Sequence, residues 1–211
     1  MQLSEQERVR RDKLTTLKGM GINPYPADQF HYTYTSTQVK ENFEEGKKVV
    51  VAGRLMSRRI QGKASFAELQ DGEGRVQVYF NRDEICTGED KTLYNEVYKK
   101  LLDIGDFIGI EGELFTTMVG EKTIKVLDFK LLSKSLKPLP LPKKDREGHE
   151  YDGFQDAEQR YRQRYVDLAV NPSVKDIFKK RSALFTAMRT FFNEKGYMEV
   201  ETPILQSIPG G

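Results

Sequence analysis

The stretch VVVAGRLMSRRIQGKASFAELQDGEGRVQVYF, Val49–Phe80, decides the fold. β-branched and aromatic residues stand at alternate positions within it, which is typical of strands with one buried face. This alternation occupies three segments: 49–55, 64–69 and 76–80. The connections Gln61-Gly62-Lys63 and Asp71-Gly72-Glu73-Gly74 place glycines where tight turns need a positive φ, so the stretch predicts a three-stranded meander.

Strand alternation returns twice further along the chain. Between Leu93 and Leu102 the apolar residues recur at helical spacing, and Gly105 ends that segment. Two strands are then expected, at 107–116 and 122–132, separated by a turn at Val119-Gly120. Three strands, a helix and two strands is the order of an OB-fold, so we predict an all-β five-stranded OB-fold barrel at 47–133.

The segments on either side of the barrel have a different character. Residues 1–46 predict a helical N-terminal extension, with a mostly solvated helix at 4–18 and a short helix at 37–45. Residues 134–153 are rich in proline and lysine and read as a linker. Residues 154–211 predict a long amphipathic helix from Pro172 to Gly196 and a strand at 197–202, the truncated start of an α+β domain.

Composition excludes several classes of protein. Lys and Arg total 34 against 32 Asp and Glu, so the net charge of +2 is no signature of nucleic-acid binding and any basic footprint must be local. Cys86 is the only cysteine and His31 and His149 stand apart, so neither a disulfide within the chain nor a metal site is expected. Because no apolar run resembles a signal peptide or a membrane span, we expect a soluble, cytoplasmic protein with no membrane contact.

A local basic footprint does occur within the barrel region. Residues 54–63 contain no acidic residue and four basic ones: Arg54, Arg58, Arg59 and Lys63. On an OB barrel this edge and the neighbouring strands form the face that binds single-stranded nucleic acid. Alternation turns Phe66 to the side of Glu68 and away from Leu69, which predicts an exposed aromatic ring, and it places the Gln77 amide on a surface.

Each of these residues also has a purely structural interpretation. An aromatic residue on a barrel strand usually packs in the core, and an arginine pair such as Arg58-Arg59 usually forms a solvated surface. Glu121, in the turn after Gly120, is ordinarily a solvated turn residue. No nucleophile–base grouping or phosphate-binding loop stands out, so the residues predict a binding protein and no catalytic residue.

Several motifs resemble bacterial lysyl-tRNA synthetases, which are class II synthetases of subclass IIb. The likeness to their anticodon-binding barrel is carried by the runs 51–54, Arg58-Arg59, 62–66, 69–71 and 74–77. The run RYRQRYVDL at 160–168 resembles the segment that enters the catalytic domain of that family, and GYMEVETP at 196–203 resembles class II motif 1. The resemblance covers the chain from about Val49 to its end.

The resemblance implies roles for the barrel residues. Phe66 would stack on the middle uridine of a lysine anticodon, and the hydrogen bonds around that base would come from Arg59, Gln77 and Glu121. The side chains expected at the tRNA backbone are Arg54, Arg58 and Lys63 on the barrel, and Arg8, Arg10, Arg11 and Lys13 on the N-terminal helix.

The resemblance also implies what surrounds the barrel. Phe192, Gly196 and Pro203 would belong to motif 1 and to the interface of a homodimer. ATP and magnesium would serve the full-length enzyme, whereas this chain, which stops before motifs 2 and 3, is expected to bind no cofactor and to be inactive alone. We therefore expect the chain to bind the tRNA(Lys) anticodon as part of a lysine–tRNA ligase; the alternatives are a stand-alone single-strand-binding OB protein and an aspartate– or asparagine–tRNA ligase.

Overall fold

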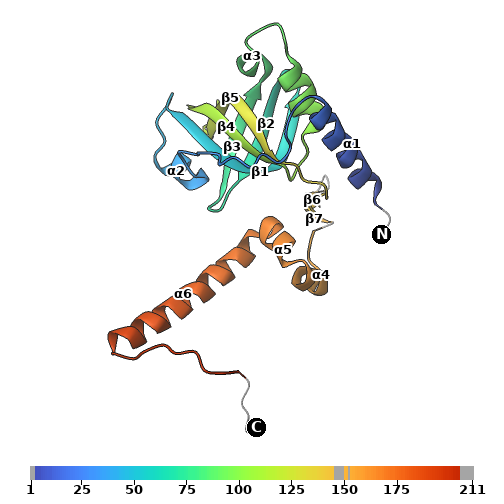
Figure 1. Cartoon of the computed structure of the whole chain (residues 1–211). Helices are drawn as coiled ribbons and strands as arrows, with labels where there is room; N and C mark the ends of the chain where they lie inside the picture. Colours follow the sequence, from blue (N-terminus) through green and yellow to red (C-terminus); the bar gives the residue numbers. More distant parts are fainter. Residues whose placement is uncertain (1–2, 145–149, 152, 205–211) are drawn as a thin grey trace. The chain divides into compact units, whose positions relative to one another are not determined.

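The computed structural model describes residues 3–144, 150–151 and 153–204. Its contacts group the chain into two compact units, 1–139 and 140–211, which are described separately (Figure 1).

The first unit is built on a closed five-stranded barrel. The strands follow one another around it in the order β1-β2-β3-β5-β4, which returns to β1. Neighbouring strands are antiparallel except β3 and β5, which are parallel. The bounds are β1 Lys48–Gln61, β2 Ala64–Gln70, β3 Arg75–Asn81, β4 Phe107–Thr116 and β5 Lys122–Ser133. The predicted OB-fold is confirmed, and β1 is longer than the alternation indicated because a bulge interrupts its pattern.

That bulge lies at Met56, where the register between β1 and β2 shifts between Leu55 and Ser57. Leu55 and Met56 are consecutive and both buried, so the side of the strand that faces inward changes at this point. Before the bulge the odd-numbered residues of β1 point into the barrel, and after it the even-numbered ones do.

One of the two predicted turns is made as expected and the other is not. Gly62, between β1 and β2, has φ +62°. Gly72 and Gly74, between β2 and β3, do not have positive φ, so that part of the prediction was wrong. The Asp71 carboxylate shapes the second turn instead, since its Oδ1 accepts hydrogen bonds from the backbone N–H groups of Glu73 and Gly74, both at 2.8 Å.

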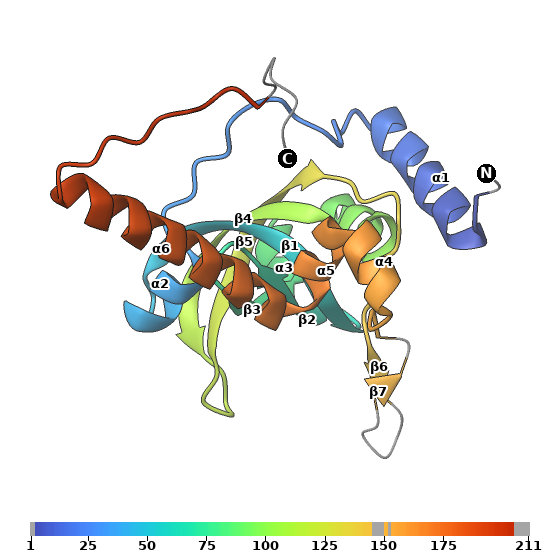
Figure 2. The ribbon, with the colours of Figure 1, turned by 90° about the horizontal axis from the view of Figure 1, so that it is seen from below.

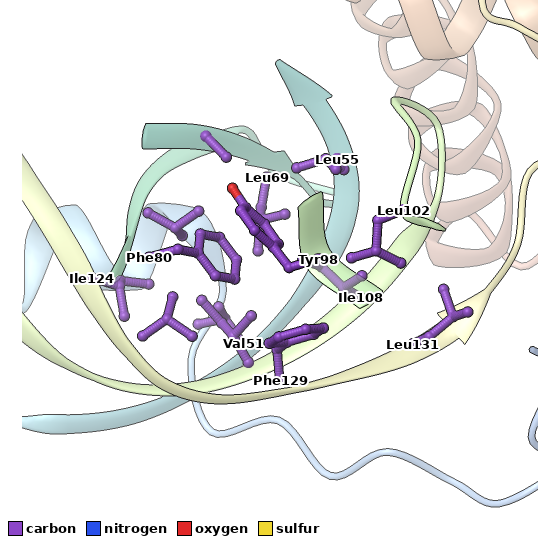
Figure 3. Close-up of a cluster of buried hydrophobic side chains, with 14 of the residues drawn as sticks. Val51, Leu55, Leu69, Phe80, Tyr98, Leu102, Ile108, Ile124, Phe129 and Leu131 are labelled. Carbon is purple, nitrogen blue, oxygen red and sulfur yellow. The ribbon is translucent and has the colours of Figure 1, made fainter. Parts of the chain in front are cut away.

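Helical segments close the barrel. The π-helix η1, Leu93–Leu101, follows the short helix α3, Arg82–Ile85, and its residues Tyr94, Val97, Tyr98 and Leu101 are buried. The ring of Tyr98 stacks on Phe80 at a centroid distance of 4.1 Å and meets the edge of Phe129 (Figure 3). The core is one cluster that takes residues from all five strands and from η1.

The N-terminal extension packs on the barrel through two helices. Helix α1, Glu5–Gly19, buries Leu17 and the stem of Arg10, and most of its other residues are exposed, as predicted. Helix α2 spans Ser36–Glu41, shorter than expected, and its N-cap is Thr35. Between the two helices, the ring of Phe30 covers Gly109 of β4 so closely that a Cβ there would lie 2.3 Å from it.

The second unit begins with two short strands, β6 Lys143–Lys144 and β7 Glu150–Tyr151, which pair with each other. Three helices follow: α4 Ala157–Arg162, α5 Arg164–Val170 and α6 Pro172–Glu194. Helix α6 starts at the predicted proline and ends before Gly196, which has φ +81°. The strand predicted at 197–202 was wrong: these residues are extended, but no strand among the described residues pairs with them.

Candidate nucleic-acid interface

A groove of about 790 Å³ lies on the outer face of the barrel across β1, β2 and β3. One wall is the connection between β4 and β5, which extends beyond the other strands as a hairpin (Figure 2). Three of the predicted site residues, Arg59, Phe66 and Gln77, line this groove. The remaining lining residues are Gln61, Ala64, Tyr79, Phe115, Thr117, Met118 and Val119.

Aromatic rings form the floor of the groove. Phe66 points outward with Glu68, as predicted, while Ser65 and Ala67 are buried. Its ring lies 5.0 Å from that of Tyr79, its cross-strand partner on β3, and Tyr79 in turn lies 5.8 Å from Phe115 on β4. Three adjacent, partly exposed rings form a surface on which a base of any identity can stack.

Arg59 stands at one end of this aromatic row. It pairs across the strands with Phe66, and the bulge at Met56 is what turns its side chain outward. With its amide oxygen facing Arg59, Gln61 accepts hydrogen bonds from Nε at 3.1 Å and from Nη2 at 2.8 Å. This contact holds the guanidinium beside the groove.

Thr123, a residue that no sequence pattern singled out, links the Gln77 side chain to the backbone of Glu121. Thr123 is fully buried, and its Oγ1 donates to Gln77 Oε1 at 2.7 Å and lies 3.2 Å from the Glu121 carbonyl oxygen. The amide of Gln77 is thereby turned with its Nε2 away from Thr123, where it can donate to a ligand. The Glu121 side chain is exposed at the base of the hairpin, next to the groove wall but not lining the groove.

The other two arginines of the basic stretch are engaged elsewhere. Arg54 donates to the Gly105 carbonyl at 3.1 Å and lies over the Phe107 ring at 4.2 Å, and its burial lowers its pKa. Arg58 pairs with the buried Ala67, on the inner side of the sheet, and donates to the carbonyl of Tyr98. Arg54 and Arg58 are thus held by contacts within the chain, and of the four residues only Arg58 points inward, so the role expected for the basic edge from Arg54 to Lys63 stays a prediction.

Two of the cations expected at the tRNA backbone on α1 are also used within the chain. Arg10 donates to the carbonyls of Ile104 at 2.9 Å and Ser135 at 3.1 Å, and Lys13 is ion-paired with Asp103 at 2.6 Å. Arg8 and Arg11 are exposed on the opposite side of the helix. Lys63 is exposed and forms a 3.1 Å pair with Asp83, which is weak at such a surface.

The motif 1 residues lie in the second unit. Phe192 is exposed near the end of α6 and meets the ring of Tyr197 at 5.5 Å. Gly196 lies in the turn after α6, and Pro203 is exposed in the extended segment that follows. Across its described part, α6 also exposes Ile177, Phe178, Leu184, Phe185, Met188 and Phe191.

The predicted site omitted several residues that line the groove. For two of them, strand alternation already indicated an outward-facing side chain. Tyr79 lies on the same face of β3 as Gln77, and Phe115 on the same face of β4 as Glu113. The exposed Met118 and Val119 at the hairpin tip carried no such signal, since residues outside strands have no period.

The described residues contain neither a metal-binding cluster nor a membrane-spanning helix. No group of three or more His, Cys, Asp or Glu side chains in that part of the chain is arranged to hold a metal ion. None of the described helices is both long and apolar enough to cross a membrane.

Two known families match the chain. Residues 49–132 match the family described as OB-fold nucleic acid binding domain, under the heading of tRNA anticodon binding. Residues 156–211 match the class II tRNA synthetases specific for D, K and N. The chain is thus similar to OB-fold nucleic-acid-binding domains over residues 49–132 and to class II tRNA synthetases over residues 156–211.

Several similar proteins share one description, lysine–tRNA ligase. The chain is 76% identical over 210 residues to the lysine–tRNA ligase of Christiangramia forsetii, with 100% of this chain and 37% of that protein covered. It is 56% identical to that of Porphyromonas gingivalis, with the same coverage, and 49% identical to that of a Thermoanaerobacter species, with 100% of the chain and 40% of the relative covered. The chain is therefore similar along its whole length to lysine–tRNA ligases, and it spans 37% to 40% of the length of these relatives.

Proposed function

We propose that the groove on the outer face of the barrel binds the anticodon loop of tRNA(Lys), and that the chain does so as part of a lysine–tRNA ligase. The observation that carries this proposal is the convergence of a cation, an aromatic row and an oriented amide, from Arg59, Phe66 and Gln77, in one groove. Cations beside stacking rings are the chemistry by which OB-folds hold single-stranded nucleic acid.

Each side chain has a separate task in this proposal. Phe66 stacks on the middle uridine, and Arg59 and Gln77 Nε2 donate hydrogen bonds to its carbonyl oxygens or to the adjoining backbone. The Glu121 carboxylate accepts a hydrogen bond from the imino N–H that distinguishes uracil from cytosine. The backbone contacts fall to Lys63, Arg8 and Arg11, which are exposed, and not to Arg54 or Arg58.

The remaining parts of the proposal concern the whole enzyme. The relatives are lysine–tRNA ligases of which this chain spans 37% to 40%, and we propose that ATP and magnesium serve the full-length enzyme. We place Phe192, Gly196 and Pro203 in a homodimer interface, supported by the exposed apolar residues of α6. A cytoplasmic location is consistent with the one cysteine, Cys86, being free.

Titration with anticodon stem-loops tests the function. The chain should bind a lysine-type loop more tightly than an aspartate-type loop carried on the same stem, as measured by fluorescence anisotropy of labelled RNA at fixed salt. Equal affinity for the two loops would contradict the assignment to lysine, and no binding of either would contradict the anticodon-binding role.

A further inference from the structure

The principal residues of the groove lie on β1, β2 and β3. One buried side chain contacts all three of these strands from the core side of the sheet. That side chain belongs to Tyr98, on η1, one of the helical segments that close the barrel. Its contacts on β1, β2 and β3 are Arg58, Ser65 and Phe80.

Each of these contacts lies one residue away from a groove residue. Arg58 precedes Arg59, Ser65 precedes Phe66, and Phe80 follows Tyr79. Because successive residues of a strand point to opposite faces, fixing one member of each pair from inside fixes the direction of the other outside. These pairs lie in neighbouring registers, since Arg59 is opposite Phe66 and Phe66 is opposite Tyr79.

The contacts themselves are specific and buried. The Tyr98 hydroxyl lies 2.7 Å from Ser65 Oγ, and Ser65 Oγ lies 3.4 Å from the carbonyl oxygen of Phe66. The Tyr98 carbonyl accepts a hydrogen bond from Arg58 Nη1, whose guanidinium also lies over the Tyr98 ring at 5.4 Å. The ring stacks on Phe80, as the close-up in Figure 3 shows.

The hydrogen bond between Tyr98 and Ser65 involves a protonated Tyr98 hydroxyl at neutral pH. Burial raises the pKa of Tyr98 above the ordinary tyrosine value, so the hydroxyl keeps its proton. The hydrogen bond from Arg58 also satisfies the Tyr98 carbonyl, because carbonyl groups near the end of a helix have no hydrogen-bond donor within the helix.

We propose that Tyr98 is a positioning residue for anticodon binding: from inside the barrel it sets the relative placement of Arg59, Phe66 and Tyr79 on the outer face. The proposal rests on the function proposed above, and it gives Arg58 a role in supporting Arg59 in place of a phosphate contact. Tyr98 itself touches no RNA.

The same helix offers a matched control. Tyr94 is also fully buried and stacks on Tyr98 at 5.3 Å, but its hydroxyl has no hydrogen-bond partner among the described residues. Tyr98→Phe and Tyr94→Phe therefore each remove one buried hydroxyl from the same helix. Only Tyr98→Phe breaks a hydrogen bond to a strand that carries groove residues, the bond to Ser65 on β2.

The test measures the affinity of the chain for a lysine-type anticodon stem-loop, below the temperature at which any variant begins to unfold. Tyr98→Phe should weaken binding by about threefold to tenfold, the range expected when one net hydrogen bond is lost from the bound arrangement, and Tyr94→Phe should stay within about twofold of the unsubstituted chain. In a Phe66→Ala background, Tyr98→Phe should cost much less, because the ring that it positions is absent. Equal affinities for the two Tyr→Phe variants, or an undiminished loss in the Phe66→Ala background, would overturn the proposal.

A second measurement separates this proposal from the function on which it rests. If Phe66→Ala binds as well as the unsubstituted chain, the proposed anticodon role fails, and backbone amide hydrogen exchange in the free chain then decides the role of Tyr98. Exchange at Arg59, Phe66 and Tyr79 that is faster in Tyr98→Phe than in Tyr94→Phe supports positioning by Tyr98, and equal exchange refutes it.

Discussion

At the scale of single residues, the proposed function assigns affinity for RNA and selectivity among bases to different side chains. An aromatic ring stacks on any base, because every base has a π-face, whereas a carboxylate or an amide distinguishes bases by their hydrogen-bonding edges. In the proposed function Phe66 supplies the first kind of contact, and Glu121, which lies next to the groove wall, supplies the second. Substitutions at these two positions should therefore change different measured quantities.

Phe66→Ala should weaken binding of lysine-type and aspartate-type stem-loops by similar factors. Loss of one stacking platform costs about 1–3 kcal/mol, or roughly fivefold to more than a hundredfold in affinity. Tyr32→Ala is the control, because Tyr32 is an exposed aromatic residue that lines a different cleft. Affinity unchanged by Phe66→Ala, with the fold verified by circular dichroism, would show that the groove is not the binding face.

Glu121→Gln should mainly relax the choice of middle base. The amide keeps the shape of the side chain but adds a donor, so the ratio of affinities for loops with a middle uridine and a middle cytidine should fall by up to about tenfold. The measurement compares that ratio with the ratio for Glu111→Gln, a substitution at an exposed glutamate of β4. A ratio that stays constant while both affinities change would remove Glu121 from base recognition.

At the scale of elements, the N-terminal helices are fastened to the barrel by polar side chains in addition to the buried Leu17 of α1 and Val39 of α2. Lys134 lies between Asp103 at 2.6 Å and Asp106 at 2.9 Å, and Lys13 of α1 reaches the same Asp103. Burial of this kind is tolerable only when every charge is paired, which is the case here. The result is that α1 is joined to the point where the chain leaves β5.

Helix α2 is fastened by Asp71, in the turn between β2 and β3. Its Oδ2 accepts from the Ser36 backbone N–H at 2.6 Å and its Oδ1 from the Ser36 hydroxyl at 2.7 Å. Burial by itself would raise the pKa of Asp71, but the hydrogen bonds from Ser36, Gly74 and Glu73 outweigh it, so the pKa lies below its ordinary value. The ionised carboxylate therefore contributes stability above the unfolded-state pKa, and this contribution is lost as the pH falls through the lower folded-state pKa.

Asp71→Asn should accordingly lower the free energy of unfolding by about 1 kcal/mol at pH 7, because the new NH₂ group faces the Ser36 N–H. The difference from the unsubstituted chain should stay constant from pH 6 to 8 and shrink below about pH 4, as the aspartate of the unsubstituted chain is protonated. Urea unfolding followed by circular dichroism at each pH measures it. The exposed Asp128→Asn is the control, and a pH-independent difference for Asp71→Asn would argue against the ionised hydrogen-bonded carboxylate.

At the scale of the whole molecule, the two units differ in how much of their apolar surface they bury. Residues 1–139 enclose a continuous core, whereas the apolar residues of α6 are largely exposed in the described part of the other unit. An exposed apolar helix face is typical of a surface that another element covers. This agrees with a chain that spans 37% to 40% of the length of its ligase relatives.

The sequence by itself determined the OB-fold order of elements, the outward direction of Phe66 and Gln77, and the start and end of α6. These follow from local periodicity and from turn and cap residues, which act over a few positions. The resemblance to lysine–tRNA ligases was equally accessible from the sequence, because the motifs that carry it are contiguous runs.

Only the tertiary structure decided which cations face the groove. If β1 were uninterrupted, Arg59 would point inward with the odd-numbered residues. The bulge at Met56, which no local sequence pattern predicts, places Arg59 on the outer face beside Phe66 and lets Arg58 contact Tyr98. Thr123 and Tyr98 also gain their roles through partners 46 and 33 positions away in the chain, Gln77 and Ser65 respectively. Contacts of that range depend on how strands pair and close, and the barrel sets them only when all five strands are in register.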